Sequence, residues 1–424
     1  MREGWTISTL GDRCHIKPPK KEARDRLSAN DMVSFVPMNN LGIREKGLKA
    51  TEDRPLGSVS GSYAYFADGD VLLAKITPCF ENGKLGIARG LTNGVGFGSS
   101  EFVVFRPDDS LDTEYLFYFL SQDSFRDAGA SVMSGAVGHK RVPKEFIESC
   151  AIPLPPLPEQ KRIVAILDEA FAGIATAVAN TEKNLANARE LFESYLSSVL
   201  SQRGEGWKVI KLGDKIDLLT GFAFKSKGYT SSPNGMALLR GDNIVPRSFR
   251  WENVKRWPAD NTDEFKKYQL EEHDVVLAMD RTWIQAGIKY AQITKDDLPC
   301  LLVQRVARLR AGPNLRAAFL KYVIGSRPFS DYVLSIQTGV GVPHISGPQI
   351  SSFEFPLPPI AMQDKFASEL DSLLSDTSSL ESIYQRKLTA LAELKQSLLQ
   401  KAFSGELTAG KEIPNATLKE EEIA

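Results

Sequence analysis

The stretch Ile152-Pro153-Leu154-Pro155-Pro156-Leu157-Pro158-Glu159-Gln160 decides the fold, because it opens a run of about 45 residues that contains no further proline. Within residues 158–202 the apolar positions follow alternating steps of three and four, with Thr181 in one slot: Val164, Leu167, Phe171, Ile174, Val178, Leu185, Ala188, Phe192, Tyr195 and Val199. Such steps are typical of a helix that packs along a partner helix. A helix of this length extends about 65 Å, which predicts a spacer rather than a core helix.

The same pattern returns about 200 residues later. Residues 355–363 restate residues 152–160, with Gln363 in the place of Gln160 and Met362 in the place of Glu159. A second helical run over 359–403 follows. Its expected apolar seam, interrupted at Lys387, consists of Phe366, Leu370, Leu373, Leu380, Tyr384, Leu391, Leu394 and Leu398.

The segments between these helices repeat as well. Residues 4–12 match 206–214, Asp70–Ala74 match Asp274–Ala278, and Ser134-Gly135 match Thr338-Gly339. A fixed internal repeat must be recognised before any other assignment of fold. We therefore expect a pseudo-twofold duplication: a first globular domain over 1–157, a long helix over 158–202, a second globular domain over 203–358, a long helix over 359–403, and a tail over 404–424.

Short apolar runs bounded by Gly, Asp and Pro predict the strands of each domain. They lie at 71–74, 102–105, 275–278 and 303–309, whereas residues 115–122 and 319–324 have the pattern of short helices. The predicted fold class is α+β, with two repeated domains that each mix helices and strands.

Composition excludes several classes of protein. The chain has 424 residues with 42% hydrophobic and 25% charged residues, as in soluble globular proteins. It lacks any stretch near 18 consecutive apolar residues, and its N-terminus does not have the pattern of a signal peptide, so we expect a cytoplasmic protein without membrane partners. Four scattered cysteines predict reduced thiols rather than a metal site.

The net charge of −1 conceals an uneven distribution. Residues 203–355 carry 22 basic and 16 acidic groups, whereas the two helical segments are acidic. A basic domain suits a polyanionic partner, although a solvated surface would have the same composition.

Two polar stretches in each repeat are candidate DNA-binding loops. They cover residues 75–84 and 138–143 in the first repeat and 279–285 and 341–346 in the second. Their side chains are donors and acceptors that can contact phosphates and base edges. The candidate residues are Lys75, Thr77, Glu81, Asn82, Lys84, His139, Lys140 and Arg141 for one half-site, and Arg281, Thr282, Trp283, Gln285 and His344 for the other, supported by Arg240, Asp242 and Asn243. Trp283 could equally belong to the core, and Asp242-Asn243 could simply shape a turn.

Motifs for catalysis and metal binding are missing. An adenine methyltransferase requires Asp, Asn or Ser before Pro-Pro-aromatic, but every Pro-Pro pair here follows Lys or Leu. The segment Gly405–Lys411 imitates a phosphate loop but carries Glu412 where a magnesium-binding Ser or Thr is needed. The four histidines are isolated from one another. We therefore predict a chain with no catalytic residues, no metal and no cofactor of its own.

Taken as an ordered set, the features resemble the specificity subunit of type I restriction-modification enzymes. The resemblance rests on residues 152–160, 355–363 and 339–346 and on the ending Ala402-Phe403-Ser404-Gly405-Glu406-Leu407-Thr408. It implies two target-recognition domains on an antiparallel helix pair, which together read a bipartite, asymmetric double-stranded DNA site. It also implies two modification subunits that use S-adenosylmethionine, and restriction subunits that use ATP and magnesium.

Two other classes of function remain open at this stage. A coiled-coil assembly scaffold whose repeats bind protein or carbohydrate would share the helices and the near-neutral charge. A single-chain enzyme with unrecognised motifs is the other alternative.

Overall fold

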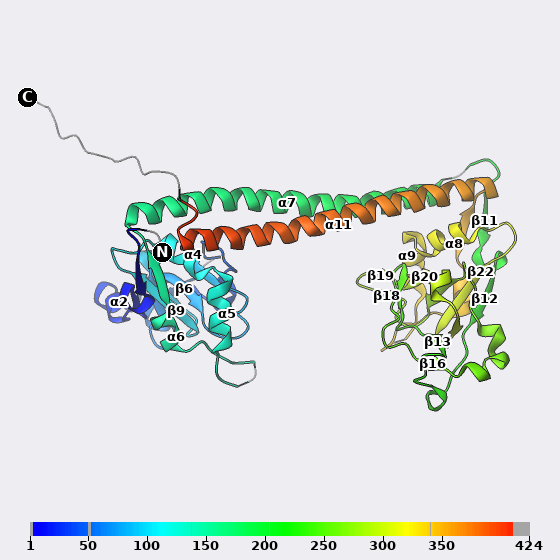
Figure 1. The fold of residues 1–424 in the computed structure, drawn as a ribbon, viewed down its shortest axis with the longest axis horizontal. Helices are drawn as coiled ribbons and strands as arrows, with labels where there is room; N and C mark the ends of the chain where they lie inside the picture. The colour runs from blue at the N-terminus through cyan, green and yellow to red at the C-terminus, as the bar shows by residue number, and fades with distance from the viewer. Residues whose placement is uncertain (1–2, 50–51, 137, 203, 340, 410–424) are drawn as a thin grey trace, which may run out of the picture. The chain divides into compact units, whose positions relative to one another are not determined.

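A computed structural model describes residues 3–49, 52–136, 138–202, 204–339 and 341–409. The expected tail from residue 410 onward lies outside the described residues. The chain forms two compact units: unit 1 contains residues 1–181 and 387–424, and unit 2 contains residues 182–386. Each unit is a globular domain together with part of both long helices (Figure 1).

The two long helices are α7 (Leu157–Ser201) and α11 (Ile360–Ser404), each of 45 residues. Their ends lie within one residue of the predicted bounds. In unit 2 they are antiparallel, because Tyr195 Oη donates to Glu369 Oε2 (2.6 Å), whereas Arg189, which is earlier in α7, pairs with Glu381, which is later in α11. In unit 1 the ammonium of Lys395 on α11 lies 4.8 Å from the ring centroid of Phe171 on α7.

The predicted seam of α7 is largely confirmed, and Thr181 in its apolar row is 1% exposed. The hydroxyl of Thr181 donates to Ala177 O (2.6 Å), so the polar group is satisfied inside its own helix. The seam of α11 was partly wrong. Leu380 and Leu394 are 38% and 46% exposed, whereas Thr377 is 4% exposed and donates to Leu373 O (2.8 Å). The prediction chose Leu380 and Leu394 because they are apolar, and it missed Thr377, which is buried although it is polar.

By length and composition, one helix among the described residues, α7, could cross a membrane, with 22% of its apolar window buried. Its apolar residues also have partners within the fold. Ile163 and Leu167 are fully buried in the core of unit 1, and Phe192 and Leu196 are 3% and 2% exposed in the core of unit 2.

The globular part of unit 1 contains two four-stranded sheets. Strands β3 (Met32–Val36) and β8 (Val95–Gly98) are parallel, whereas the other pairs in these sheets are antiparallel. The sheet orders are β2-β9-β6-β7, with β2 (Cys14–Ile16), β9 (Phe102–Pro107), β6 (Val71–Ala74) and β7 (Leu85–Ile87), and β4-β3-β8-β5, with β4 (Glu52–Pro55), β3 (Met32–Val36), β8 (Val95–Gly98) and β5 (Ala64–Ala67). The remaining elements are β1 (Thr6–Thr9) paired with β10 (Ala151–Leu154), and helices α1 (Leu10–Arg13), α2 (Lys21–Arg26), α3 (Leu56–Val59), α4 (Thr113–Leu120), α5 (Asp123–Ser131) and α6 (Lys144–Ser149).

Unit 2 repeats this plan with one four-stranded and one three-stranded sheet. Its sheet orders are β12-β22-β17-β20, with β12 (Ile216–Thr220), β22 (Val306–Ala311), β17 (Val275–Ala278) and β20 (Tyr290–Gln292), and β16-β13-β21, with β16 (Arg256–Trp257), β13 (Met236–Leu239) and β21 (Cys300–Leu302). The remaining elements are the pairs β11 (Lys208–Lys211) with β23 (Glu354–Leu357), β14 (Ile244–Val245) with β15 (Ser248–Phe249), and β18 (Trp283–Ile284) with β19 (Gly287–Ile288), and helices α8 (Ala317–Ile324), α9 (Arg327–Ile336) and α10 (Gly347–Ser351). The strand expected over 303–309 begins at Val306, because Arg305 has a left-handed φ of 66° in the preceding turn.

The matched glutamines fix the start of each long helix. Gln160 is fully buried, accepts from Asp112 N (2.8 Å), and donates to Ser110 O and Pro155 O (both 2.8 Å). Gln363 is also fully buried, accepts from Arg316 N (2.8 Å), and donates to Asn314 O and Pro358 O. Each amide thus joins a helix start to the loop that precedes α4 or α8.

The mismatch between Glu159 and Met362 has a local cause. Glu159 is 4% exposed and accepts a hydrogen bond from Thr408, which lies beyond the end of α11. Met362 instead packs against the hydrophobic core of unit 2.

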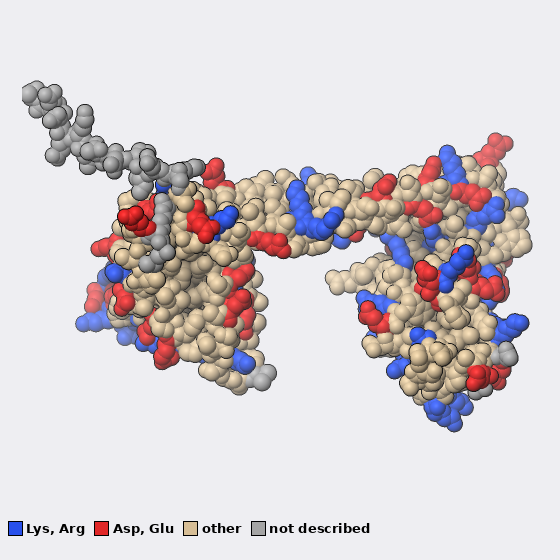
Figure 2. Space-filling model, viewed as in Figure 1, with Lys and Arg blue, Asp and Glu red and all other residues tan. Residues whose placement is uncertain are grey.

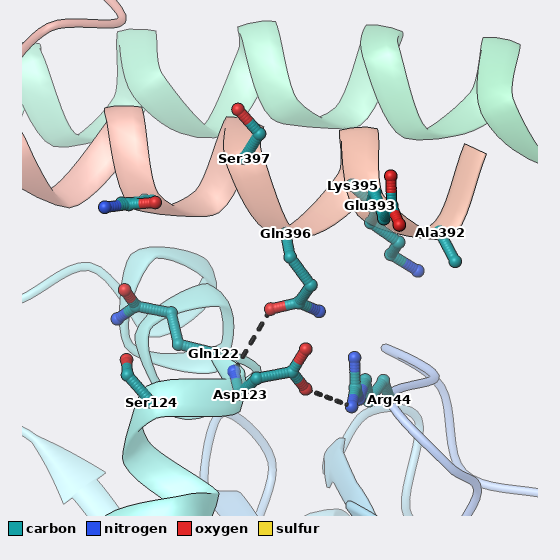
Figure 3. Close-up of a pocket in the computed structure, with 10 residues that line it drawn as sticks. Arg44, Gln122, Asp123, Ser124, Ala392, Glu393, Lys395, Gln396 and Ser397 are labelled. Carbon is teal, nitrogen blue, oxygen red and sulfur yellow. Dashed lines mark hydrogen bonds and ion pairs between the residues drawn. The ribbon is translucent and has the colours of Figure 1, made fainter. Parts of the chain in front are cut away.

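A second contact between domain and helix differs in the two units. In unit 1, Arg44 pairs with Asp123 (2.7 Å) at the first turn of α5, and the backbone N–H of Asp123 donates to Gln396 Oε1 (3.1 Å) on α11 (Figure 3). A pocket of about 800 Å³ lies beside these residues. In unit 2, Arg247 pairs with Glu193 on α7 (2.6 Å), and its guanidinium lies 4.6 Å from the Phe192 ring centroid.

Candidate nucleic-acid interface

The two predicted loops of unit 1 lie side by side. The first follows β6, and its Thr77 N–H donates to Lys140 O (2.9 Å) in the second loop. Val142 N donates back to Lys75 O (3.0 Å). The buried ring of Phe80 anchors the first loop in the core. Residues 75–84 and 138–143, far apart in sequence, therefore present one continuous polar surface at the end of β6.

Unit 2 repeats this pairing with different residues. Arg281 N donates to Pro343 O (2.7 Å), and Ile345 N donates to Met279 O (2.9 Å). These loops follow β17, the counterpart of β6. The strands and helices that the two domains share, called the frame below, thus bring the two candidate loops together in each unit. The loop sequences differ between the units.

Four candidates in unit 1 point into solvent: Glu81, Asn82, His139 and Lys140. Thr77 Oγ1 donates to Glu81 Oε1 (3.0 Å). Lys84 is half-buried, and its ammonium donates to Met38 O (2.7 Å), which ties the loop to the neighbouring segment. This contact gives Lys84 a structural role in the loop.

Arg141 is exposed but forms a two-pronged ion pair with Glu101, at 2.7 and 2.9 Å. The hydrogen bonds from Arg141 lower the pKa of Glu101 despite its partial burial. The pair fixes the guanidinium at the end of β6 while leaving it accessible.

In unit 2, Arg281 and Gln285 are exposed, and Trp283 is 41% exposed, so the core alternative for this tryptophan was wrong. Half-buried His344 forms a 3.2 Å hydrogen bond with Thr338 Oγ1 through Nε2. Thr282, in contrast, is 1% exposed, because the chain turns its side chain inward between two exposed neighbours. It does not reach the surface in this conformation.

The supporting residues of unit 2 divide into two kinds. Arg240 pairs with exposed Asp242 (2.9 Å). Asn243 is 8% exposed, accepts from Arg240 N (3.1 Å) and donates to Arg250 O (3.0 Å). Its amide therefore shapes the turn, which favours the alternative noted for this position over base contact.

A basic cleft adjoins the loop pair of unit 1. We call this pocket of about 520 Å³ cleft 1, and its basic lining residues are Lys17, Lys20, Lys75, Arg141 and Lys144. Burial lowers the pKa of Lys20, and the charges of Arg24 and Lys17 lower it further. An anion bound in cleft 1 would be stabilised there, because its charge would offset the repulsion among these basic side chains.

Sequence reasoning missed Lys17, Lys20 and Lys144. The dipeptide Pro18-Pro19, flanked by Lys17 and Lys20, was the available signal, because two consecutive prolines mark a loop in which basic neighbours can meet solvent.

Cleft 2, a pocket of about 380 Å³, is its counterpart in unit 2. Its charged lining residues are Arg240, Asp242, Asp280, Arg281, Lys289 and Arg305. Arg305 lies 3.7 Å from Asp280. Burial lowers the pKa of Lys289; the charge of Asp242 opposes this effect and that of Arg281 adds to it. Lys289 and Arg305 were also missed, because neither lies in a polar run of sequence.

Lys and Arg side chains also gather at the end of unit 2 where β13 and β16 lie (Figure 2). This distribution agrees with the net positive charge expected for the second domain.

The described residues contain no cluster of three or more His, Cys, Asp or Glu side chains that could hold a metal ion. All four cysteines are free. Burial raises the pKa of Cys14 and Cys300 to about 12 and that of Cys150 to about 11. These three thiols are therefore protonated at neutral pH, unlike reactive thiolates.

Comparison with known proteins separates the alternatives. The family model described as "Type I restriction modification DNA specificity domain" matches the chain twice, at residues 2–185 and 204–390. The Escherichia coli type I restriction enzyme EcoAI specificity subunit is 31% identical over 95% of this chain and 83% of its own length. The MjaVIII specificity subunit of Methanocaldococcus jannaschii is 28% identical over 70% of this chain and 71% of its own length.

Two solved structures share the fold. One is described as the structural basis underlying complex assembly and conformational transition of the type I R-M system; it has a TM-score of 0.79, 19% identity, and coverage of 96% of this chain and 99% of that chain. The HsdS subunit from Thermoanaerobacter tengcongensis has a TM-score of 0.63, 20% identity, and coverage of 96% and 98%. These similarities favour the specificity-subunit prediction over the scaffold and enzyme alternatives. The chain belongs to the type I restriction-modification DNA specificity family and is a specificity subunit, a non-catalytic member of such systems.

Proposed function

We propose that this chain reads a bipartite, asymmetric DNA site, with unit 1 contacting one half and unit 2 the other. One observation carries the proposal: in each repeat, two polar loops of different sequence are hydrogen-bonded together beside a basic cleft. A domain fold that is repeated within the chain, with different side chains at its loops, suits two readers of two different sequences.

The basic residues of the clefts would contact phosphates and thereby set the register of each domain on the duplex. Exposed side chains of the loops would then contact base edges. Arg281 favours guanine, Asn82 and Gln285 favour adenine, and Glu81 favours cytosine.

The long helices would set the gap between the half-sites. Both α7 and α11 run without a break through parts of both units. Because each helix is stiff, its length would determine which gap permits both domains to bind.

The catalytic partners follow from the family. Two modification subunits, one for each repeat, would use S-adenosylmethionine to methylate adenine, and restriction subunits would use ATP and magnesium. This chain would supply the target sequence to that complex in the cytoplasm.

Arg281→Ala in the full complex tests the reading role. We expect specific binding to weaken by about 1 to 3 kcal/mol and one position of the second half-site to become degenerate. Sequencing of methylated adenines in cells gives the motif. Arg327→Ala is the matched control, because this exposed arginine lies on α9, outside cleft 2. An unchanged motif in the Arg281 variant would remove this residue from the reading surface.

An insertion of seven residues after Thr181, with an equal insertion after its repeat counterpart Tyr384, tests the spacing role. One heptad keeps the seam and lengthens each helix by about 10 Å. We expect the methylated motif to retain both half-sites but to acquire a gap longer by about three base pairs, at 3.4 Å per pair. A motif with the original gap would show that the helices do not set it.

A further inference from the structure

The hairpin formed by β18 and β19 carries an exposed tryptophan. Trp283 pairs across the hairpin with Ile288, and Ile284 pairs with Gly287. Ile288 is 4% exposed and belongs to the core, whereas Trp283 is 41% exposed. Directly paired residues project from the same face of a hairpin, so the buried Ile288 anchors the face from which the partly exposed Trp283 projects.

Basic residues lie close to Trp283 along both strands of the hairpin, since Lys289 directly follows its cross-strand partner Ile288. Arg281 precedes it by two residues and lines cleft 2 with Arg240, Lys289 and Arg305. Lys289 N donates to Thr282 O (2.8 Å). This backbone hydrogen bond joins Lys289 to the strand that contains Trp283.

An exposed apolar side chain lines cleft 2 itself. Val342 is 43% exposed and belongs to the loop whose Pro343 carbonyl accepts from Arg281 N. Aromatic and aliphatic groups on a basic surface can contact bases, because bases stack on rings while cations hold phosphates.

Unit 1 lacks this feature at the matching place among its described residues. Counting from the shared strands β6 and β17, Cys79 corresponds to Trp283, and Cys79 lies half-buried in a turn rather than in a hairpin. A general requirement of the frame therefore does not explain the tryptophan.

We propose that Trp283 is an apolar wedge that inserts at a base step of the second half-site and partly unstacks it. This inference rests on the proposed DNA-reading function and specifies how unit 2 performs it. Part of the second half-site would be read through its deformability, which favours a flexible pyrimidine–purine step at the point of insertion.

The test uses the complete complex and a duplex containing its methylated motif. 2-Aminopurine is placed in turn at each position of both half-sites, since its fluorescence rises when a base is unstacked. Apart from the target adenines, which the modification subunits must flip out of the duplex to methylate, we expect a several-fold rise at one step of the second half-site on binding. Trp283→Ala should abolish that rise and weaken specific binding about 10-fold, as expected for loss of one base–aromatic contact.

Trp283→Phe is the conservative variant and should retain most of the rise. The salt dependence of binding should be the same in all three proteins, because phosphate contacts are unchanged. This readout separates a wedge from a general loss of fold, which would also alter the salt slope and the signal at the first half-site.

Three outcomes would overturn the inference. Tight specific binding with no fluorescence change in the second half-site would reject the wedge while leaving the DNA-reading function intact. A rise that persists in Trp283→Ala would assign the distortion to another residue. Failure of Trp283→Ala to assemble with the modification subunits in the absence of DNA would identify the tryptophan as a protein contact. Absence of specific binding by the unaltered complex would reject the proposed function itself.

Discussion

Units 1 and 2 share some of their buried polar contacts and differ in their exposed loops. Gln160 and Gln363 make the same three hydrogen bonds at the starts of α7 and α11. The loops after β6 and β17 instead present Lys75-Ile-Thr77 in one unit and Met279-Asp-Arg281 in the other.

Buried polar groups explain why the first set is retained. A buried donor or acceptor without a partner costs free energy, so both partners must be kept together. An exposed loop has no such constraint and can vary with the target. The difference between the units therefore separates residues that stabilise the shared fold from residues that can vary, among which we propose the DNA contacts.

The largest expected effect comes from the buried ion pair within each sheet. Asp70 is 1% exposed and forms two hydrogen bonds with Arg106, and Asp274 does the same with Arg310. Asp70→Ala should destabilise unit 1, and Asp274→Ala unit 2, by about 3 kcal/mol, because each removes two charge-assisted hydrogen bonds and leaves the arginine only its more exposed partner, Glu22 or Glu271. Hydrogen exchange read separately for β6 and β17 measures the two effects.

Asp109→Ala, at an exposed carboxylate of unit 1, is the control and should change neither unit. If Asp70→Ala loosened β6 and β17 equally, the units would not be independent in stability.

The organisation of the fold was predictable because it depends on repetition. Prolines before a long apolar periodicity, found twice, specified α7 and α11 to within one residue. The sheet orders were not predictable, since the parallel pairing of β3 with β8 joins segments far apart in sequence. Thr377 was missed because a threonine that bonds its own helix backbone can occupy an apolar seam.

A smaller effect is expected at the glutamines that start the long helices. Gln160→Ala and Gln363→Ala each remove three hydrogen bonds from a fully buried site. Each should lower the stability of its own unit by about 2 kcal/mol, because backbone groups lose their partners. Thermal unfolding with exchange of α4 and α8 measures the change. Similar losses of stability in the two units would support an equivalent role for the two glutamines. A loss in only one unit would show that their roles differ.

The site was less predictable than the frame, because exposure depends on tertiary position. Sequence placed the loops correctly but could not tell that Thr282 turns inward while Trp283 turns outward. Lys289 and Arg305 enter cleft 2 from separate strands and turns, so no local pattern could join them.

A still smaller effect is expected where α4 and α8 contact the long helices. Tyr118 Oη donates to Asp168 on α7, and Tyr322 Oη donates to Asp371 on α11 (2.5 Å). Tyr118→Phe and Tyr322→Phe should each cost about 1 kcal/mol, since the carboxylates keep Lys46 and Lys321 as partners. Chemical denaturation of both variants tests this. A double variant that loses more than the sum would show that the two contacts are coupled.

The smallest predicted effect is a pH dependence confined to unit 1. Glu114 forms ion pairs with Lys46 (2.6 Å) and Arg89, whereas Ala318 occupies the matching position in unit 2. Burial alone would raise the pKa of Glu114, but the hydrogen bonds from Lys46 and Arg89 lower it overall. The ionised carboxylate therefore stabilises the folded unit above its unfolded pKa of about 4.3, and this contribution is lost as the pH falls through the lower folded pKa. Glu114→Gln should remove about 0.5 to 1 kcal/mol at pH 7 and nothing once the pH lies below both values. Urea unfolding of α4 at a series of pH values measures this difference, with α8 as the internal control. An equal loss at pH 7 and at low pH would show that Glu114 acts through packing rather than charge.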